Sequence, residues 1–373
     1  MLFQNDWLCV EIKRNTMNTK LVYVLTCAPE KYYIEQALIA VFSARHWNPD
    51  AHIVLIVDDL TNQLFEGNRA EILNYLSEKI VVPFNDVSLT PMYRSRWIKT
   101  SVRQLVKGNF IFVDCDTIVC KDLSGIDDFD CKVGAVLESH LLVEDYCDSL
   151  RRKALTVNAR IGVDLDKEKE YFSSGVLWVK DVPDSYRLFE LWHQYWLESE
   201  AIGLPIDQPS LAKANRECGH LIKRIPDTFN CILFTRNSFV EKAHILHVAA
   251  FRNPSFLFTE KVFKCIKENG LLEWIKDAIL HPQDTMLPFD YAVRHSTIGK
   301  RLDWIWAISH TASVIRRNLP ILLEDFPMQS SFRKGVLWLF NRRCYMAGAM
   351  IWMIWKRIQV FRKKNLKDNA CKK

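Results

Sequence analysis

Apolar runs alternate with stretches of helical periodicity through the first third of the chain. Four runs rich in Val, Ile and Phe have the length and composition of buried strands, and these are 21–26, 52–59, 79–84 and 109–116. Between them, apolar residues recur with helical spacing over 29–47, 62–77 and 91–107. Strands that alternate with helices in this way predict an α/β fold, Rossmann-like, with a mostly parallel sheet flanked by helices.

The rest of the chain continues the pattern with longer connections. The predicted elements are a strand at 133–139, a polar helical insertion at 141–170, a strand at 171–181, a helix at 183–200 and a late strand at 243–251. From about 257 the pattern is helical. We therefore divide the chain into an N-terminal extension (1–16), an α/β domain (17–256), a helical C-terminal region (257–332) and a tail (333–373).

Composition and charge narrow the class of protein. The chain has 373 residues, of which 49% are hydrophobic and 25% charged, which is typical of a globular protein and excludes disorder and fibrous repeats. The net charge is +6, but the tail holds twelve Lys and Arg residues against the single acidic residue Asp368. The body is therefore acidic, which argues against a nucleic-acid partner.

The tail also contains a 12-residue apolar run, 344–355, between basic residues. As a helix this run is about 18 Å long, which is too short for a hydrocarbon core of about 30 Å. Trp, Tyr and Met residues beside many cations predict an interfacial helix that binds an anionic membrane surface. The alternative is a Trp-rich helix packed on the rest of the protein.

The cysteines indicate a reducing compartment. Eleven cysteines are scattered singly, without a Cys-x-x-Cys pair, and the first 16 residues lack the apolar core of a signal peptide. We expect reduced thiols and a cytoplasmic protein that is peripheral on the inner face of the cell membrane. Met17 is an alternative start of the chain.

Two carboxylates close the apolar strand FIFV. Asp114 and Asp116 are separated by one residue, so on an extended chain they point to the same side. Two hard oxygen ligands can converge there on one divalent cation, which in turn would hold a diphosphate. The alternative is a strand that ends in an Asx turn.

Four segments, in order, resemble GT-A fold glycosyltransferases, and most closely family 8 and its bacterial relatives. They are the Asp-Cys-Asp motif after FIFV, the strand YFSSGVLWVKD, the segment IDQPSL and the strand HILHV. The resemblance covers roughly residues 20–255. It implies a GT-A domain, to which the helical C-terminal region is an extension, a Mn²⁺ or Mg²⁺ ion as cofactor, and a nucleotide sugar as donor.

The resemblance implies a metal site made by Asp114, Asp116 and a late histidine. His247 fits that place, since it ends an apolar strand, whereas His244 lies near the start of the strand. The family has a lysine on the donor diphosphate shortly after this histidine. Arg252 is the candidate for that role here.

The resemblance also assigns residues on the sugar side. Asp207 and Gln208 match the pair that meets the donor sugar, and Glu138 lies where the family often has a sugar-contacting Asp. Ser174 and Gly175 match the family's strand motif, although Ser173 replaces its Asn. Without the resemblance, Asp207 reads equally well as a helix N-cap.

Further candidates for the donor come from position. The helix before the metal strand carries Arg96 and Lys99 on one face, where the family has a basic donor contact. The ends of the first two strands, at Thr26, Cys27 and Asp58, are where a uracil and ribose would lie.

Together these patterns predict a metal-dependent transferase that moves a hexose-type sugar from a UDP-sugar to a surface glycan or a lipid-linked acceptor, with retention as the resemblance implies. Two alternatives remain. An inverting GT-A enzyme would use Glu138 or Asp207 as base, and a catalytically silent protein would bind nucleotide sugar at the membrane. A sugar-phosphate nucleotidyltransferase would need a Gly-rich loop after the first strand, and the segment TCAPEKYY there is no such loop.

Overall fold

The computed structural model describes residues 17–86, 88–146, 148–232, 242–248, 255–282 and 285. The strands are β1 (Lys20–Leu25), β2 (Ile53–Asp58), β3 (Glu78–Val82), β4 (Phe110–Val113), β5 (Thr117–Val119), β6 (Val133–Leu137), β7 (Phe172–Val179), β8 (Ile222–Arg224), β9 (Cys231–Ile232) and β10 (Ile245–His247). The α-helices are α1 (Tyr33–Trp47), α2 (Asp59–Asn62), α3 (Pro91–Thr100), α4 (Val102–Leu105), α5 (Asp148–Ala159), α6 (Pro183–Ala201), α7 (Asp207–Glu217), α8 (Glu260–Asn269) and α9 (Glu273–Leu280).

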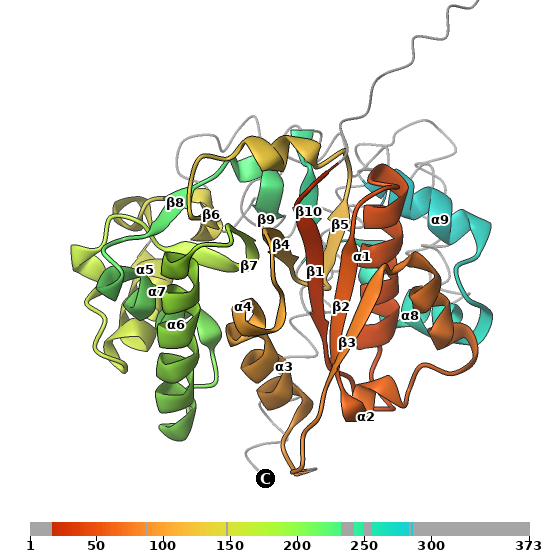
Figure 1. The fold of residues 1–373 in the computed structure, drawn as a ribbon, viewed down its shortest axis with the longest axis horizontal. Coiled ribbons are helices and arrows are strands. Elements are labelled where there is room, and N and C mark those ends of the chain that lie inside the picture. The colour runs from red at the N-terminus through yellow and green to blue at the C-terminus, as the bar shows by residue number, and fades with distance from the viewer. Residues whose placement is uncertain are drawn as a thin grey trace, which may run out of the picture.

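A seven-stranded sheet runs through the centre of the molecule in the order β3-β2-β1-β4-β7-β6-β8 (Figure 1). The pairs β3/β2, β2/β1, β1/β4 and β6/β8 are parallel, whereas β7 runs antiparallel to both β4 and β6. Each of β1, β2 and β4 is almost wholly apolar and buried, as expected for strands covered on both faces. The predicted α/β fold with a mostly parallel sheet is confirmed.

Two apolar layers cover the two faces of this sheet. On one face, Ile34 and Leu38 of α1 pack with Leu55 of the sheet, and α8 and α9 extend this layer. On the other face, Ile98 of α3 and Trp192 of α6 pack with further sheet residues. Figure 1 shows α1, α8 and α9 together on one side and α3, α4 and α6 on the other.

A small second sheet, in the order β5-β10-β9, lies beside the end of β4. β10 pairs antiparallel with β5, so that His247 lies opposite Thr117, and parallel with β9. Because β5 follows β4 after only three residues, this pairing brings the end of β10 to the turn that carries Asp114 and Asp116.

Two predicted helices differ in the structure. The segment 62–77 is predicted as one helix. In the structure its first residue is the last of α2, and a 3-10 helix follows over Gly67–Tyr75, where Gly67 has a φ of 54°. The helix predicted over 91–107 is interrupted at Ser101. Ser101 lies between α3 and α4, and both its hydroxyl, at 2.7 Å, and its amide, at 3.2 Å, donate to the Trp97 carbonyl.

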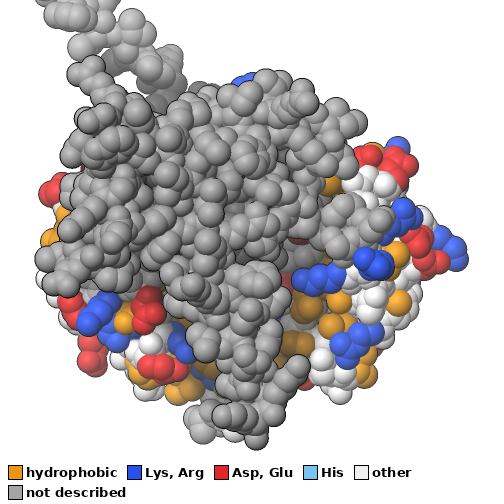
Figure 2. All heavy atoms as spheres, turned by 180° about the vertical axis from the view of Figure 1, so that it is seen from behind, with side chains coloured by type: hydrophobic (Ala, Val, Ile, Leu, Met, Phe, Trp, Pro, Cys, Tyr) orange, Lys and Arg blue, Asp and Glu red, His pale blue; other side chains and the backbone are white. Residues whose placement is uncertain are grey.

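The predicted helical C-terminal region is helical as far as it is described, since α8 and α9 lie between 257 and 282. The rest of 257–332, apart from residue 285, the extension 1–16 and the tail 333–373 lie outside the described residues. Within the described part of the chain, none of the helices has both the length and the apolar character needed to cross a bilayer. Where described residues are visible from behind, acidic and basic side chains lie interspersed (Figure 2).

Candidate active site

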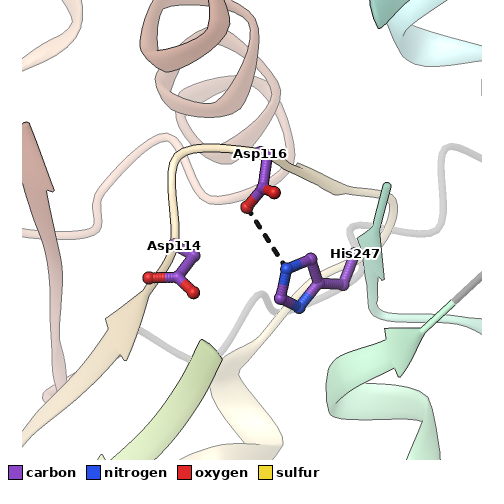
Figure 3. A group of neighbouring side chains, drawn as sticks. All are labelled: Asp114, Asp116 and His247. Atoms are coloured by element: carbon purple, nitrogen blue, oxygen red, sulfur yellow. Dashed lines mark ion pairs between the residues drawn. The ribbon is translucent and has the colours of Figure 1, made fainter. Parts of the chain in front are cut away.

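The turn after β4 is held between two strands of different sheets. On one side, the Asp114 amide donates to the carbonyl of Gly175 on β7 at 2.8 Å. On the other side, the amide of Val248, just after β10, donates to the carbonyl of Asp116 at 2.9 Å. These backbone bonds fix both carboxylates relative to His247, the last residue of β10 (Figure 3).

The side chains of Asp114, Asp116 and His247 converge, as the sequence predicts. One ligand atom from each lies within 4.8 Å of the others, and His247 Nε2 is 3.2 Å from Asp116 Oδ1. The side chains are 26%, 23% and 14% exposed, so the group can be reached from solvent. In the described ranges, no other set of three acidic, His or Cys side chains meets in this way. His244 lies apart, stacked on Phe229 at 4.4 Å.

This group fits a divalent metal ion. Two carboxylates and an imidazole are ligands that Mn²⁺ accepts, and Nδ1 of His247 is bonded to Asn230 Oδ1 at 3.0 Å, which leaves Nε2 for a metal. Gly175 provides the room, because a Cβ there would lie 2.4 Å from Cε1 of His247 and 3.1 Å from an oxygen of Asp114.

Burial and charge repulsion both oppose ionisation of these carboxylates, whereas the neighbouring cations favour it. Burial raises the pKa of Asp114, and the neighbouring Asp116 adds to the rise while Lys99 opposes it. Burial also acts against ionisation of Asp116, but the imidazolium of His247 brings the pKa of Asp116 below its usual range. Burial disfavours the charged form of His247, yet Asp116 raises the pKa of this histidine overall. A cation at this point would relieve the repulsion between the carboxylates.

A network of buried charges continues from this group to α7. Lys99 Nζ lies 3.1 Å from Asp114 and 3.2 Å from Asp207, while Arg96 Nε lies 3.1 Å from the other oxygen of Asp207. The Ser174 hydroxyl donates to Asp207 at 2.9 Å. Although burial favours the neutral acid, Lys99 and Arg96 hold the pKa of Asp207 well below its usual range. Asp207 is therefore a permanently charged hydrogen-bond acceptor.

Asp207 begins α7, but its side chain does not cap that helix. No side-chain cap bond occurs at this helix start, where the N-cap position is Ile206. The backbone carbonyl of Asp207 instead accepts from the indole of Trp192 at 2.9 Å, which ties α7 to α6. The side chain is thus left to the charged network, which disfavours the N-cap interpretation.

Gln208 and Glu138 are brought together by hydrogen bonds. The Gln208 amide donates to Glu138 Oε2 at 3.1 Å and to the carbonyl of Phe172 at 2.9 Å. Glu138 follows β6, and the next two residues, Ser139 and His140, have positive φ angles of 59° and 57°. Such a conformation is costly for residues other than Gly, and it concentrates at functional sites.

The ends of β1 and β2 form a separate network. Asp58 caps α2 by accepting from the Thr61 amide at 2.9 Å and forms a buried ion pair with Arg94. The Thr61 hydroxyl accepts from the Cys27 amide at 2.7 Å, and the Thr26 hydroxyl donates to the Pro91 carbonyl at 2.6 Å. These candidates lie at the predicted edge, but the Asp58 carboxylate is fully buried and both its oxygens are bonded within the protein.

The structure therefore brings most of the predicted residues into one contact network, which links the metal ligands through Lys99 to Asp207 and Arg96. Arg252 lies outside the described residues. Sequence reasoning missed Asn230, which contacts His247 and whose only sequence signal is its place before a short apolar pair. It also missed Arg94 as the partner of Asp58.

No family model matches the chain, and no curated protein matches it in sequence. Among solved structures, apo mouse xyloside xylosyltransferase 1 is similar, with 14% identity and a TM-score of 0.41 over 62% of this chain and 97% of that chain. The galactosyltransferase LgtC, in complex with donor and acceptor sugar analogues, has 13% identity and a TM-score of 0.43 over 61% of this chain and 86% of that chain. The glycosyltransferase GlyE of Streptococcus pneumoniae TIGR4 has 16% identity and a TM-score of 0.42 over 71% of this chain and 63% of that chain.

These similar structures are all glycosyltransferases, the class that the sequence motifs resemble. At such identities and TM-scores the likeness carries no detail of substrate or chemistry. The function proposed below is argued from the residues of this chain.

Proposed function

We propose that the protein is a metal-dependent glycosyltransferase that moves a hexose-type sugar from a UDP-sugar to a hydroxyl of a glycan or lipid-linked acceptor. The observation that supports this most is the convergence of Asp114, Asp116 and His247 beside the charged Asp207. A nucleotide-sugar donor needs cations around its diphosphate and, next to them, hydrogen-bond acceptors for the hydroxyl groups of its sugar. This network has both within a few ångströms.

The cationic half of the site serves the leaving diphosphate. A divalent ion held by Asp114, Asp116 and His247 would neutralise the negative charge that builds on the diphosphate as the glycosidic bond breaks. Lys99 and Arg96 provide two fixed cations beside that position, and Arg96 is 32% exposed, which makes it the more accessible of the two.

The carboxylate half serves the sugar. Asp207, ionised and held from three sides, orients the sugar by accepting hydrogen bonds from its hydroxyl groups. Glu138 and Gln208 extend this surface, because the amide of Gln208 fixes the carboxylate of Glu138. The nucleotide would lie beside Thr26 and Cys27, at the end of β1.

We propose retention of the anomeric configuration over inversion. An inverting enzyme needs a carboxylate base with a pKa near the working pH. The pKa of Asp207 is held far below that range by Lys99 and Arg96, despite burial, so Asp207 is a poor base. Glu138 remains the one candidate base of the inverting alternative, and the anomer of the product decides between the two.

The test is turnover of a panel of nucleotide sugars by the purified full chain, with Mn²⁺ and with a chelator. We expect Mn²⁺-dependent hydrolysis of a UDP-sugar without acceptor, lost in Asp116→Asn and kept in the matched control Asp184→Asn, an exposed residue paired with Lys132. Full activity in chelator contradicts the proposal. Binding without turnover favours the silent binding protein, and preference for another nucleotide overturns the choice of UDP.

We also propose that the acceptor is lipid-linked and that the basic tail holds the protein on the inner face of the cell membrane. This rests on the composition of 333–373, twelve cations beside Trp and Met, each cation being worth about 1 kcal/mol near an anionic surface. Sedimentation with anionic vesicles is expected for the full chain and not for a chain that ends at 332. Equal binding of the truncated chain contradicts the membrane role of the tail.

A further inference from the structure

We infer that Asn230, held by Ser173, is a positioning residue that sets which ring nitrogen of His247 is presented to the metal. Neither residue is among those that the sequence motifs place at the site as ligands. The inference rests on the proposed function, since it concerns the same metal site. Its main observations are two hydrogen bonds in series, from the buried Ser173 through the buried Asn230 to His247, whose side chain is 14% exposed.

The first bond fixes the proton on the imidazole. Nδ1 of His247 lies 3.0 Å from the amide oxygen of Asn230. A carbonyl oxygen only accepts hydrogen bonds, so Nδ1 carries the proton and donates it. Nε2 is then the nitrogen left for the metal. It faces Asp116 at 3.2 Å, and without metal it donates to that carboxylate in an ion pair.

The second bond fixes the amide of Asn230. An Asn amide can present either its oxygen or its nitrogen to a neighbour, so its orientation needs a cause. The nitrogen of Asn230 donates to the Ser173 hydroxyl oxygen at 3.2 Å, and the amide of Gly175 donates to the same oxygen at 3.4 Å. In this arrangement the nitrogen of Asn230 faces Ser173 and its oxygen faces His247.

The fold explains why these residues meet. Ser173 and Gly175 are two apart on β7 and so lie on the same face of that strand. Gly175 leaves space for the imidazole, since a Cβ there would be 2.8 Å from Nδ1 of His247. Asn230 is the residue before β9, which pairs in parallel with β10, and His247 lies opposite Ile232 in that pairing.

The consequence concerns the strength of metal binding. A second partner that fixes the tautomer and the ring orientation of a ligating histidine typically changes metal affinity by about 10–100-fold. We therefore expect Asn230 to influence the metal affinity without touching the metal, the donor or the acceptor. Ser173 acts one step further away, so its removal should have the smaller effect.

The experiment uses the full chain and two measurements that need no turnover. Nitrogen chemical shifts of His247, recorded with saturating Mg²⁺, which is diamagnetic, report which ring nitrogen carries the proton when the metal is bound. Free Mn²⁺ measured by electron paramagnetic resonance reports the affinity without nucleotide sugar.

The variants are Asn230→Ala, Ser173→Ala and Asn230→Asp, which keeps an acceptor opposite Nδ1. Thr228→Val is the matched control, because it removes the 3.1 Å contact with His244, which lies just before β10.

We expect the Nδ1-protonated tautomer in the wild type and a mixture in Asn230→Ala. The Mn²⁺ affinity should fall about 10–100-fold in Asn230→Ala, less in Ser173→Ala and not in Asn230→Asp or Thr228→Val. An Nε2-protonated ring in the wild type overturns the inference, whatever the variants do. So does wild-type Mn²⁺ affinity in a folded Asn230→Ala.

The outcomes separate this inference from the proposed function. If the wild type binds no Mn²⁺, the proposed metal site itself fails. If the wild type binds Mn²⁺ and a folded Asn230→Ala binds it equally well, the metal site stands and the role of Asn230 fails. If Asn230→Ala does not fold, Ser173→Ala decides: a drop in affinity with a folded chain supports the relay, and an unchanged tautomer and affinity overturn it.

Discussion

Lys99 and Asp207 form a buried ion pair, with Nζ 3.2 Å from Oδ2 and both side chains at most 6% exposed. The same ammonium group also lies 3.1 Å from Asp114, at the end of β4. One lysine therefore links a carboxylate of the candidate metal centre to the carboxylate proposed to meet the sugar. The two halves of the site are electrostatically coupled through it.

Replacing this lysine should cost stability. Lys99→Met leaves Asp114 without its nearest cation, and removing one partner of a buried pair typically costs about 3–5 kcal/mol. We expect a lower urea midpoint of unfolding for this variant. The control is Lys132→Met, whose partner Asp184 is about half exposed, and which should change the free energy of unfolding by less than about 1 kcal/mol. An equal loss of unfolding free energy in the two variants would show that the buried ion pair stabilises the fold no more than the exposed one.

The sequence predicts the carboxylates because their context is local. Asp114 and Asp116 end an apolar strand, and the same-side rule for alternate residues places them together before any tertiary contact is known. The sequence also identifies His247, because this residue lies in the last of four motifs that occur in the order of the family. Its choice over His244 follows from its place at the end of a strand.

The sequence cannot predict contacts that depend on strand pairing between distant segments. Asn230 meets His247 only because β9 pairs with β10, and β9 is two residues long, too short to leave a periodic pattern. Likewise Asp58 looks available at a strand end. Its pairing with Arg94 depends on how α3 packs on the sheet. The break between α3 and α4 at Ser101 is not visible in the sequence pattern, because helical periodicity continues across it.

A methyl group at Gly175 should damage metal binding more than folding. The Cβ of Gly175→Ala would lie 2.4 Å from Cε1 of His247, so the imidazole must move from its place beside Asp116. We expect at least a tenfold loss of Mn²⁺ affinity, about the effect of losing a partner that orients a ligand. Gly125→Ala is the control, since a Cβ there meets nothing within 4 Å. Unchanged Mn²⁺ binding in Gly175→Ala would mean that His247 is not a ligand.

Stability should fall in mild acid partly because of His193. Burial lowers the pKa of this histidine below its ordinary value of 6.5, and its Nδ1 lies 2.7 Å from the Thr100 hydroxyl. The unfolded chain then binds a proton more readily than the folded chain. The contribution of His193 is thus complete above about pH 6.5 and is lost as the pH falls toward the folded pKa.

The variant His193→Gln isolates this effect. Denaturant midpoints at pH 7.5 and 5.5 should fall less for the variant than for the wild type, because the variant has no proton to take up at this position. His244, whose pKa burial also lowers, is present in both chains and cancels. An equal fall of the denaturant midpoint in both chains would show that His193 does not contribute to the loss of stability in acid.

Replacing Asp207 should reduce turnover and leave the metal in place. Asp207→Asn keeps the shape of the side chain but removes the charge that accepts from Ser174 and pairs with Lys99 and Arg96. A hydrogen bond to a charged group is worth about 1.5–3 kcal/mol, so kcat/KM for donor hydrolysis should fall roughly ten- to a hundredfold. Mn²⁺ affinity measured without donor should stay within a few fold of wild type, because Asp207 is not among the converging ligands. Asp116→Asn is the contrast, since it should lose both. Hydrolysis at the wild-type rate in Asp207→Asn would show that the sugar is bound elsewhere, even if the metal site is correct.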